Sequence, residues 1–246
     1  MVVAYFDCFS GIAGDMILGA LIDLGVDEKF LKKELKKLSL SGYTIAVKHV
    51  ASHHIHAVDF TVTVQEEQCE RNLLDITAML EESRLSPTVI GKCKNIFQRL
   101  AHAESRVHRI DINEVHFHEV GAVDSIIDIV GSVIGIERLG IEKIYCSPLP
   151  LGHGFVTCAH GVLPLPAPAT VELLKGVPVY SVDRMQELVT PTGAAIITTL
   201  AADYGEMQRM RIQQIGYGSG KIPSKYPNLL RVFIGEELSK DSKRAL

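Results

Sequence analysis

A short apolar run, a glycine-containing loop and a helical pattern follow one another directly at the start of this 246-residue chain. Residues 2–6 are continuously apolar, which predicts a buried strand, and residues 14–24 carry apolar side chains at helical spacing up to Gly25. A buried strand that leads through a short loop into an amphipathic helix is typical of folds in which helices pack on a sheet. The opening residues therefore restrict the chain to folds that contain both elements.

The same alternation continues along the rest of the chain. Further strands are predicted where apolar residues alternate or run together, at 43–64 (two strands), 141–146, 177–180, 210–217 and 229–234. Helical spacing and capping residues predict helices at 27–38, 72–80, 87–107, 121–139, 169–175 and 190–203. No internal repeat is present. The predicted fold class is therefore α/β or α+β, with helices packed on a mixed sheet.

Two segments depart from this pattern. Residues 148–168 are rich in proline and glycine, and we expect an irregular functional loop with room for one hairpin. Residues 237–246 are charged, which predicts a frayed tail or a linker. Residues 1–236 are then expected to form a single domain.

Composition argues against several classes of function. The net charge of −4 provides no general attraction for nucleic acid or an anionic membrane. We expect no secretory signal, because Asp7 interrupts the first apolar run, and no membrane span, because Asp124 and Asp128 interrupt the most apolar stretch. The five cysteines form no CxxC pair, which favours free thiols in a reducing compartment. The predicted location is the cytoplasm.

The loop at 7–16 has the geometry of an anion site. Gly11 and Gly14 lie three residues apart between a predicted strand and a predicted helix, where backbone N–H groups are free to face a ligand. Asp7 and Asp15 would repel a bare phosphate but suit a phosphate that arrives with a divalent cation. The pattern matches neither the Walker A nor the dinucleotide motif. A tight turn, with Asp15 favouring the helix dipole, explains the residues equally well.

The segment at 114–128 gathers potential metal ligands. On extended backbone His116 and His118 would share a face, as in a chelating HxH pair. Asp124 and Asp128 lie four residues apart on one helical face, and two glycines, at 131 and 135, continue that stripe. Such a face allows a close approach by a ligand or by another helix. The alternative is that the aspartates are caps or solvated groups.

Two further segments are candidates for binding. The histidine-rich tract at 52–56 is typical of transition-metal binding, although a flexible polar loop explains it equally well. Thr190 and Thr192 flank Pro191 at a predicted helix N-terminus, where a phosphate could rest. No GxSxG or HExxH motif is present, so the sequence supports neither a serine hydrolase nor a zincin.

Taken together, five segments resemble the LarC family, the nickel insertion proteins of nickel-pincer cofactor assembly: 6–26, 115–131, 147–170, 187–195 and 215–220. The likeness runs in unbroken order from residue 3 to about 236. The resemblance implies a lyase-type nickel chelatase that uses CTP and a divalent metal, Mg or Mn. It would install nickel into pyridinium-3,5-bisthiocarboxylic acid mononucleotide.

Members of that family carry a further C-terminal domain, to which CTP binding is attributed. The resemblance here covers the N-terminal portion, so the implied partners are the pyridinium mononucleotide and that C-terminal domain, with the oligomeric state left open. Two other functions remain compatible with the residues. One is a nickel metallochaperone or scaffold without catalysis. The other is a stand-alone metal-dependent phosphohydrolase built on His116, His118, Asp124 and Asp128.

The physical interpretation of these segments predicts three groups of site residues. The predicted catalytic residues are Asp7, Asp15, Asp124 and Asp128. The residues predicted to bind the cofactor or substrate are Ser10, Gly11, Gly14, Thr190, Thr192 and Gly193. The predicted metal ligands are His116, His118, Glu119, His54 and His56. We expect the 7–16 loop and the 116–128 segment to be neighbours, and the tract at 52–56 to be poorly ordered without metal.

Overall fold

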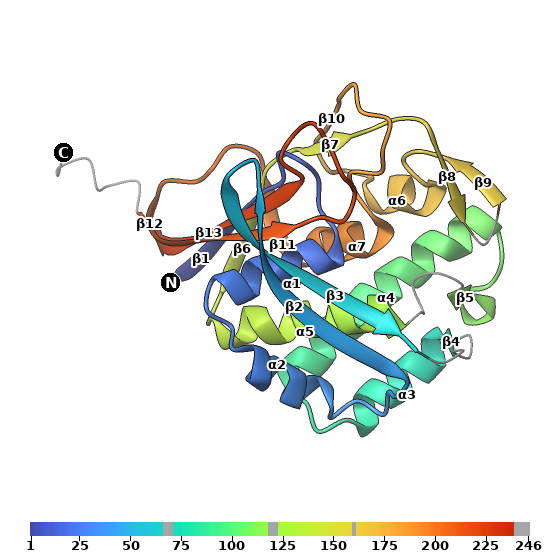
Figure 1. The fold of residues 1–246 in the computed structure, drawn as a ribbon. Helices are drawn as coiled ribbons and strands as arrows, with labels where there is room; N and C mark the ends of the chain where they lie inside the picture. Colours follow the sequence, from blue (N-terminus) through green and yellow to red (C-terminus); the bar gives the residue numbers. More distant parts are fainter. Residues whose placement is uncertain (66–70, 118–122, 159–160, 239–246) are drawn as a thin grey trace.

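The computed structural model describes residues 1–65, 71–117, 123–158 and 161–238. Within these ranges the chain forms a seven-stranded mixed sheet with helices packed against it (Figure 1), so the predicted fold class is confirmed. None of the helices in the described part of the chain combines the length and the apolar character that crossing a bilayer requires.

The sheet is mixed because strands from both ends of the chain meet at its centre. The first strand, β1, is parallel to β6 and antiparallel to β13. At one edge the hairpin β2–β3 joins through a parallel pairing of β3 with β12. The order across the sheet is β11 (Ala201–Tyr204), β6 (Lys143–Cys146), β1 (Val2–Asp7), β13 (Leu229–Glu237), β12 (Met210–Ser219), β3 (Ile55–Val64) and β2 (Tyr43–Ser52).

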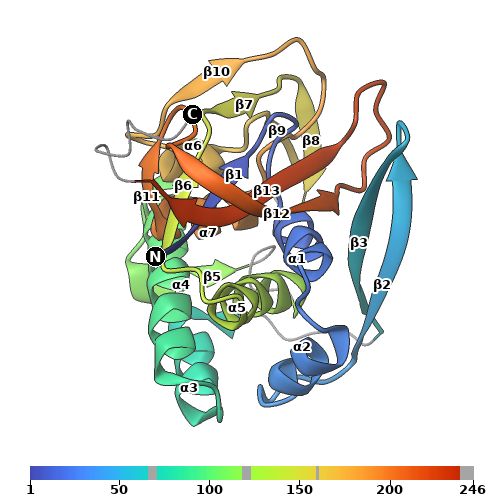
Figure 2. The ribbon, with the colours of Figure 1, turned by 90° about the vertical axis from the view of Figure 1, so that its left-hand side faces the viewer.

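Helices α1, α4 and α5 lie together on one side of the sheet (Figure 2). In β1, Ala4 and Phe6 are buried in the main core on this side, whereas Val3 and Tyr5 pack into a small cluster with Phe233. The helices are α1 (Gly14–Asp23), α2 (Glu28–Leu35), α3 (Leu73–Glu82), α4 (Pro87–His108), α5 (Val123–Arg138), α6 (Pro168–Leu173) and α7 (Pro191–Leu200), with a 3-10 turn, η1 (Ile112–Glu114). The main core therefore lies between the sheet and the helices.

The two glycines at 131 and 135 lie where α5 crosses α1. A Cβ on Gly131 would lie 3.0 Å from Leu18 Cδ2 of α1, and a Cβ on Gly135 would lie 3.0 Å from Leu21 Cδ1. The small side of α5 thus lets α1 pack closely against it. Of the two occupants that the sequence left open for this stripe, the structure shows another helix.

The irregular segment at 148–168 contains the hairpin for which the sequence left room. β8 (Phe155–Cys158) and β9 (Gly161–Pro164) pair antiparallel, while β7 (Leu149–Leu151) pairs with β10 (Val179–Ser181). The remaining short pair is β4 (Arg71–Asn72) with β5 (His116–Phe117).

The predicted helix at 190–203 is too long at its C-terminal end. The backbone of Ala201 is extended, with φ −70° and ψ 131°, and residues 201–204 form β11 instead. This strand pairs with β6 at the edge of the sheet. The local apolar pattern does not separate the last helical turn from a short strand, so a long-range pairing decided the boundary.

Candidate functional site

The loop after β1 is held against the segment that leads into α7. The Ile12 N–H donates to the Leu188 carbonyl at 2.8 Å, and the Thr190 N–H donates to the Ile12 carbonyl at 3.1 Å. Gly11 has φ +102°, and a side chain there would collide with the Leu188 carbonyl. Glycine at this position therefore allows two loops, distant in sequence, to bring the N-termini of α1 and α7 together.

At its N-terminus α1 lies directly against α5. A Cβ on Gly14 would lie 2.6 Å from the Cβ of Asp128, so the two helices could not approach this closely with a larger residue. The backbone N–H of Asp15 hydrogen-bonds to the Asp128 carboxyl. One oxygen of that carboxyl, Asp128 Oδ1, is buried and has no hydrogen-bond partner within the described residues.

The pKa of Asp128 is raised well above the ordinary aspartate value. Burial is the main cause, and the nearby carboxylates of Asp15 and Asp124 add to it. Burial also raises the pKa of Asp15, and this effect exceeds the lowering by Lys221. Ionisation of Asp15 or Asp128 is therefore less favourable than ionisation of an exposed aspartate, unless a cation compensates the negative charge.

These carboxyls line a cavity of about 420 Å³ where α1, α5 and α7 begin and β3 passes. Its lining residues are Ala13, Gly14, Asp15, Phe60, Thr61, Val62, Asp124, Ser125, Asp128, Thr190, Thr192 and Lys221. The 7–16 loop and the 116–128 segment therefore contribute to one cavity. The prediction that they are neighbours is confirmed.

Lys221 provides the positive charge of this cavity. Its ammonium donates to the Phe60 carbonyl at 2.7 Å and to Thr61 Oγ1 at 2.8 Å, and it also binds the Asp59 carboxylate. Its Nζ lies 3.7 Å from Asp15 Oδ2. Sequence reasoning missed this lysine, although it directly follows the glycine-rich segment at 215–220.

Hydroxyl groups form the part of the wall next to α7. Thr190 caps α7, because its Oγ1 accepts the Gly193 N–H at 3.1 Å. Thr192 Oγ1 donates to Ser125 Oγ at 3.2 Å, which links the first turns of α7 and α5. The polar side chains that line the cavity carry carboxylates, hydroxyls and one ammonium. None of the lining residues that the structure describes carries an imidazole or a thiol.

The segments that build this cavity belong to a known family. A family model described as nickel insertion protein matches residues 4–246. The chain belongs to the nickel insertion protein family. Three relatives illustrate the similarity.

Two of them, from Desulfitobacterium hafniense strains DCB-2 and Y51, are named pyridinium-3,5-bisthiocarboxylic acid mononucleotide nickel insertion protein. They are 49% and 48% identical to this chain over 241 residues, which is 98% of the chain and 60% of each relative. A third, from Dictyoglomus thermophilum, is 52% identical over 236 residues, or 96% of the chain and 61% of that protein. The chain thus spans about three fifths of the length of these family members. No solved structure matches it.

Some residues predicted for the site lie outside the cavity wall of this family member. Asp7, at the end of β1, accepts from Arg231 Nε and Nη2 at 3.0 and 2.5 Å. Ser10 is buried and accepts from Arg184 Nη1 at 2.8 Å. A Cβ on Gly193 would collide with the backbone of Ile12, so close packing explains why this position is glycine. The loop therefore has two faces: Asp7 and Ser10 accept hydrogen bonds from arginines, whereas Ala13, Gly14 and Asp15 line the cavity with the carboxyls of α5.

The grouping of the predicted metal ligands stays a prediction, because only some of them lie within the described residues. His116 lies on extended backbone in β5, as expected, while His118 and Glu119 fall outside the described ranges. His54 lies in the β2–β3 turn with φ +65°, and His56 is exposed in β3. Within the described ranges, no three His, Cys, Asp or Glu side chains lie close enough to hold a metal by themselves.

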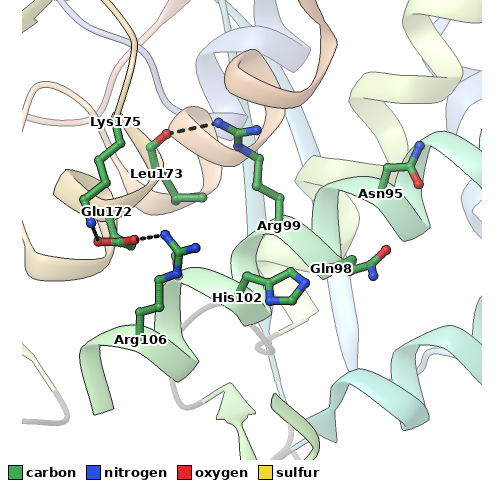
Figure 3. Close-up of a pocket in the computed structure, with 9 residues that line it drawn as sticks. Asn95, Gln98, Arg99, His102, Arg106, Glu172, Leu173 and Lys175 are labelled. Atoms are coloured by element: carbon green, nitrogen blue, oxygen red, sulfur yellow. Dashed lines mark hydrogen bonds and ion pairs between the residues drawn. The ribbon is translucent and has the colours of Figure 1, made fainter. Parts of the chain in front are cut away.

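A second hollow, of about 480 Å³, lies between α4 and α6 (Figure 3). Its charged groups are largely paired with one another: Glu172 binds Arg106 at 2.7 Å and Lys175 at 2.5 Å, which lowers the pKa of Glu172. Arg99 Nη2 donates to the Leu173 carbonyl at 3.4 Å. None of the predicted site residues lines this hollow. The acidic cavity at the start of α1, α5 and α7 is therefore the candidate site.

Proposed function

We propose that this chain is the substrate-binding part of a nickel insertion enzyme that acts on pyridinium-3,5-bisthiocarboxylic acid mononucleotide. The mononucleotide is held in the acidic cavity. Two relatives that the chain matches over 98% of its length carry this substrate in their names. The cavity volume of about 420 Å³ lies in the range of small-molecule sites.

The observation that carries the proposal is the buried Asp128 Oδ1, which has no partner in the described chain and belongs to a residue that lines the cavity. A buried polar atom without a hydrogen bond is unfavourable by about 1–3 kcal/mol, and of the four such side-chain atoms in the described chain only Asp128 Oδ1 belongs to a residue of the cavity lining. The threonine hydroxyls at the start of α7 lie in the same cavity, beside the positive end of a ten-residue helix. That end suits the phosphate of a mononucleotide.

The complete reaction requires more than this chain in the proposal. The resemblance to the LarC family supports a CTP-dependent lyase-type reaction in which nickel is the inserted metal. The chain covers about three fifths of its relatives, and we assign CTP binding, with Mg or Mn, to the remaining part. Asp15, Asp124 and Asp128 are the proposed reactive carboxyls of the part described here.

The proposal is tested by calorimetric titration of the chain with the pyridinium mononucleotide. Thr190→Val and Thr192→Val should each weaken binding at least about tenfold, since each removes a hydroxyl that lines the cavity at the start of α7, where the phosphate is proposed to lie. Asp203→Asn is the matched control, because Asp203 is exposed on β11 at the opposite edge of the sheet from β3. Binding that survives both cavity variants but disappears in Arg99→Ala would move the substrate to the hollow between α4 and α6.

Turnover is tested separately with nickel, CTP and the mononucleotide. This chain alone should release no nickel-containing product, whereas the full-length relative from Desulfitobacterium hafniense should release it, as measured by mass spectrometry. The aspartate equivalent to Asp124 in that relative should be required. Full product formation by this chain alone would contradict the assignment of CTP binding to the part of the relatives that this chain does not cover.

A further inference from the structure

We propose that the hollow between α4 and α6 is a second binding site, which takes a small phosphate-bearing anion. The anion is free phosphate or the phosphate group of a phosphorylated small molecule. The site is separate from the acidic cavity, because the described residues that line the two have no member in common. The inference therefore goes beyond the proposed function and does not depend on it.

The first argument is the charge of the lining. Arg99, Arg106 and Lys175 are positive, and Glu172 is the one carboxylate among the lining residues that the structure describes. The hollow thus carries an excess of positive charge on a chain whose net charge is −4. A concave surface with charge of one sign concentrates ions of the opposite sign. The lining therefore attracts anions.

The second argument is that two of the positive groups are held in place. Glu172 holds both of them, because its Oε1 accepts from Arg106 at 2.7 Å and its Oε2 lies 2.5 Å from Lys175 Nζ. The hydrogen bonds from Lys175 and from Arg106 lower the pKa of Glu172, so this carboxylate stays ionised. Arg106 and Lys175 remain 70% and 65% exposed. They are thus oriented before a ligand arrives and still accessible to it, which lowers the entropic cost of binding.

The third argument is the unused hydrogen-bonding capacity of α4. Arg99 has five N–H donors, and its one hydrogen bond within the described residues, to the Leu173 carbonyl, is 3.4 Å long. Arg99 and Arg106 lie two helical turns apart, and both point from α4 towards α6 (Figure 3). A guanidinium is a planar fork of donors that matches two oxygens of a phosphate. Phosphate is therefore the anion that these arginines fit best.

The fourth argument is the size of the hollow. Its volume of about 480 Å³ lies in the range of small-molecule sites, and a lone phosphate would occupy only part of it. Asn95 and Gln98 line the same hollow from α4. Their amides donate and accept hydrogen bonds, so they suit the hydroxyl groups of a molecule attached to the phosphate.

The test uses inorganic phosphate and ribose 5-phosphate as probes, each titrated calorimetrically into the chain in a chloride buffer. At least one probe should bind saturably. Tighter binding of ribose 5-phosphate would identify a phosphorylated small molecule as the ligand, and equal affinities would show that the phosphate group alone is recognised. Acetate should compete with neither probe. Equal competition by acetate would show a general attraction for anions and contradict a phosphate site.

Arg99→Gln and Lys175→Gln should each weaken binding of the tighter probe at least about tenfold, because each removes a charge that pairs with the phosphate. Glutamine keeps a good helix former in α4. Arg209→Gln is the matched control, because it removes the same charge at an exposed position on the connection between β11 and β12. The control should bind the probe as the parent chain does.

No saturable binding of either probe, or binding that both variants in the hollow leave unchanged, would overturn the inference. Binding of the pyridinium mononucleotide is measured on the same variants. Arg99→Gln should leave it unchanged, whereas Thr192→Val should weaken it and leave binding of the phosphate probe unchanged. Failure of the phosphate site and failure of the proposed function are therefore distinguishable.

Discussion

At the scale of single residues, the cavity is built from side chains whose surroundings differ from what their positions in sequence suggest. Asp7 and Asp15 flank one loop, yet Asp7 forms an ion pair with Arg231 and Asp15 lies beside Asp128. Asp7 Oδ2 accepts two hydrogen bonds from the Arg231 guanidinium, whereas Asp128 Oδ1 is buried and has no hydrogen-bond partner within the described residues. Equal residue types in one motif therefore have unequal chemical roles.

The raised pKa of Asp128 leads to a pH-dependent stability. A carboxyl with a raised pKa in the folded state stabilises the fold below its unfolded pKa of about 3.9, and this contribution is lost as the pH rises through the folded pKa. Without metal, Asp128→Asn should therefore melt above the parent chain at pH 8. The difference should shrink towards pH 4.5.

Thermal melts in chelator-containing buffer from pH 4.5 to 8.5 measure this difference. Asp203→Asn should follow the parent at every pH. A constant offset between Asp128→Asn and the parent over the whole range would show that Asp128 is not a strained carboxyl.

At the scale of elements, helix starts and helix crossings position the cavity. α4 and α7 begin in the same way, with a hydroxyl cap followed by proline: Ser86 accepts from the Val89 N–H and Thr190 from the Gly193 N–H. Only Thr190 lines the cavity. Substitutions at these two caps therefore distinguish the effect of a cap on stability from its effect on ligand binding.

Thr190→Ala should cost about 0.5–2 kcal/mol of stability and also weaken binding of the mononucleotide. Ser86→Ala should cost a similar amount, since it removes an equivalent cap, and should leave binding unchanged. Urea unfolding measures the first quantity and calorimetric titration the second. Equal binding by both variants would remove Thr190 from the site.

The crossing of α1 and α5 gives a second prediction at this scale. Gly131→Leu should destabilise the fold by about 1–3 kcal/mol, because a Cβ there already lies 3.0 Å from Leu18 and larger side chains overpack the interface. Gly91→Ala is the matched control in α4, where a Cβ meets no heavy atom within 4 Å. It should raise stability by about 0.5–1 kcal/mol through helix propensity. Unfolding free energies from urea titrations decide, and a neutral Gly131→Leu would argue against the tight crossing.

At the scale of the whole molecule, one hydrophobic core joins the sheet to its helices. That core includes residues from β1, α1, α4, α5 and α7. The cavity lies at the border of the core, where three of the helices begin. Its geometry therefore depends on the packing of the entire helical layer.

We accordingly expect the described domain to unfold as one unit. Leu18→Ala, in the fully buried interface of α1, should lower the unfolding free energy by about 2–5 kcal/mol and shift all probes together. Far-ultraviolet circular dichroism and tyrosine fluorescence, available from seven tyrosines without tryptophan, should give coincident curves. Separate transitions would show that the sheet and the helical layer fold independently.

Local sequence patterns were enough to predict most of the individual strands and helices. Strands and helices followed from apolar periodicity, and the caps at Asp27, Ser86 and Thr190 formed as expected, because these features depend on neighbours within a few residues. Membership of the family and the position of Asp15 and Asp124 at one cavity could also be predicted. The partner of each side chain, in contrast, depends on contacts between segments that are distant in the sequence.

Sheet order, and not local pattern, placed Arg231 against Asp7 across 224 residues of sequence and carried Lys221 to β3 across 160 residues. Helix packing gave the glycines at 131 and 135 a neighbouring helix instead of a ligand. It also buried one oxygen of Asp128, which has no hydrogen-bond partner among the residues that the structure describes. These contacts join segments that no short-range periodicity relates. They exist only once the sheet and the helical layer have come together.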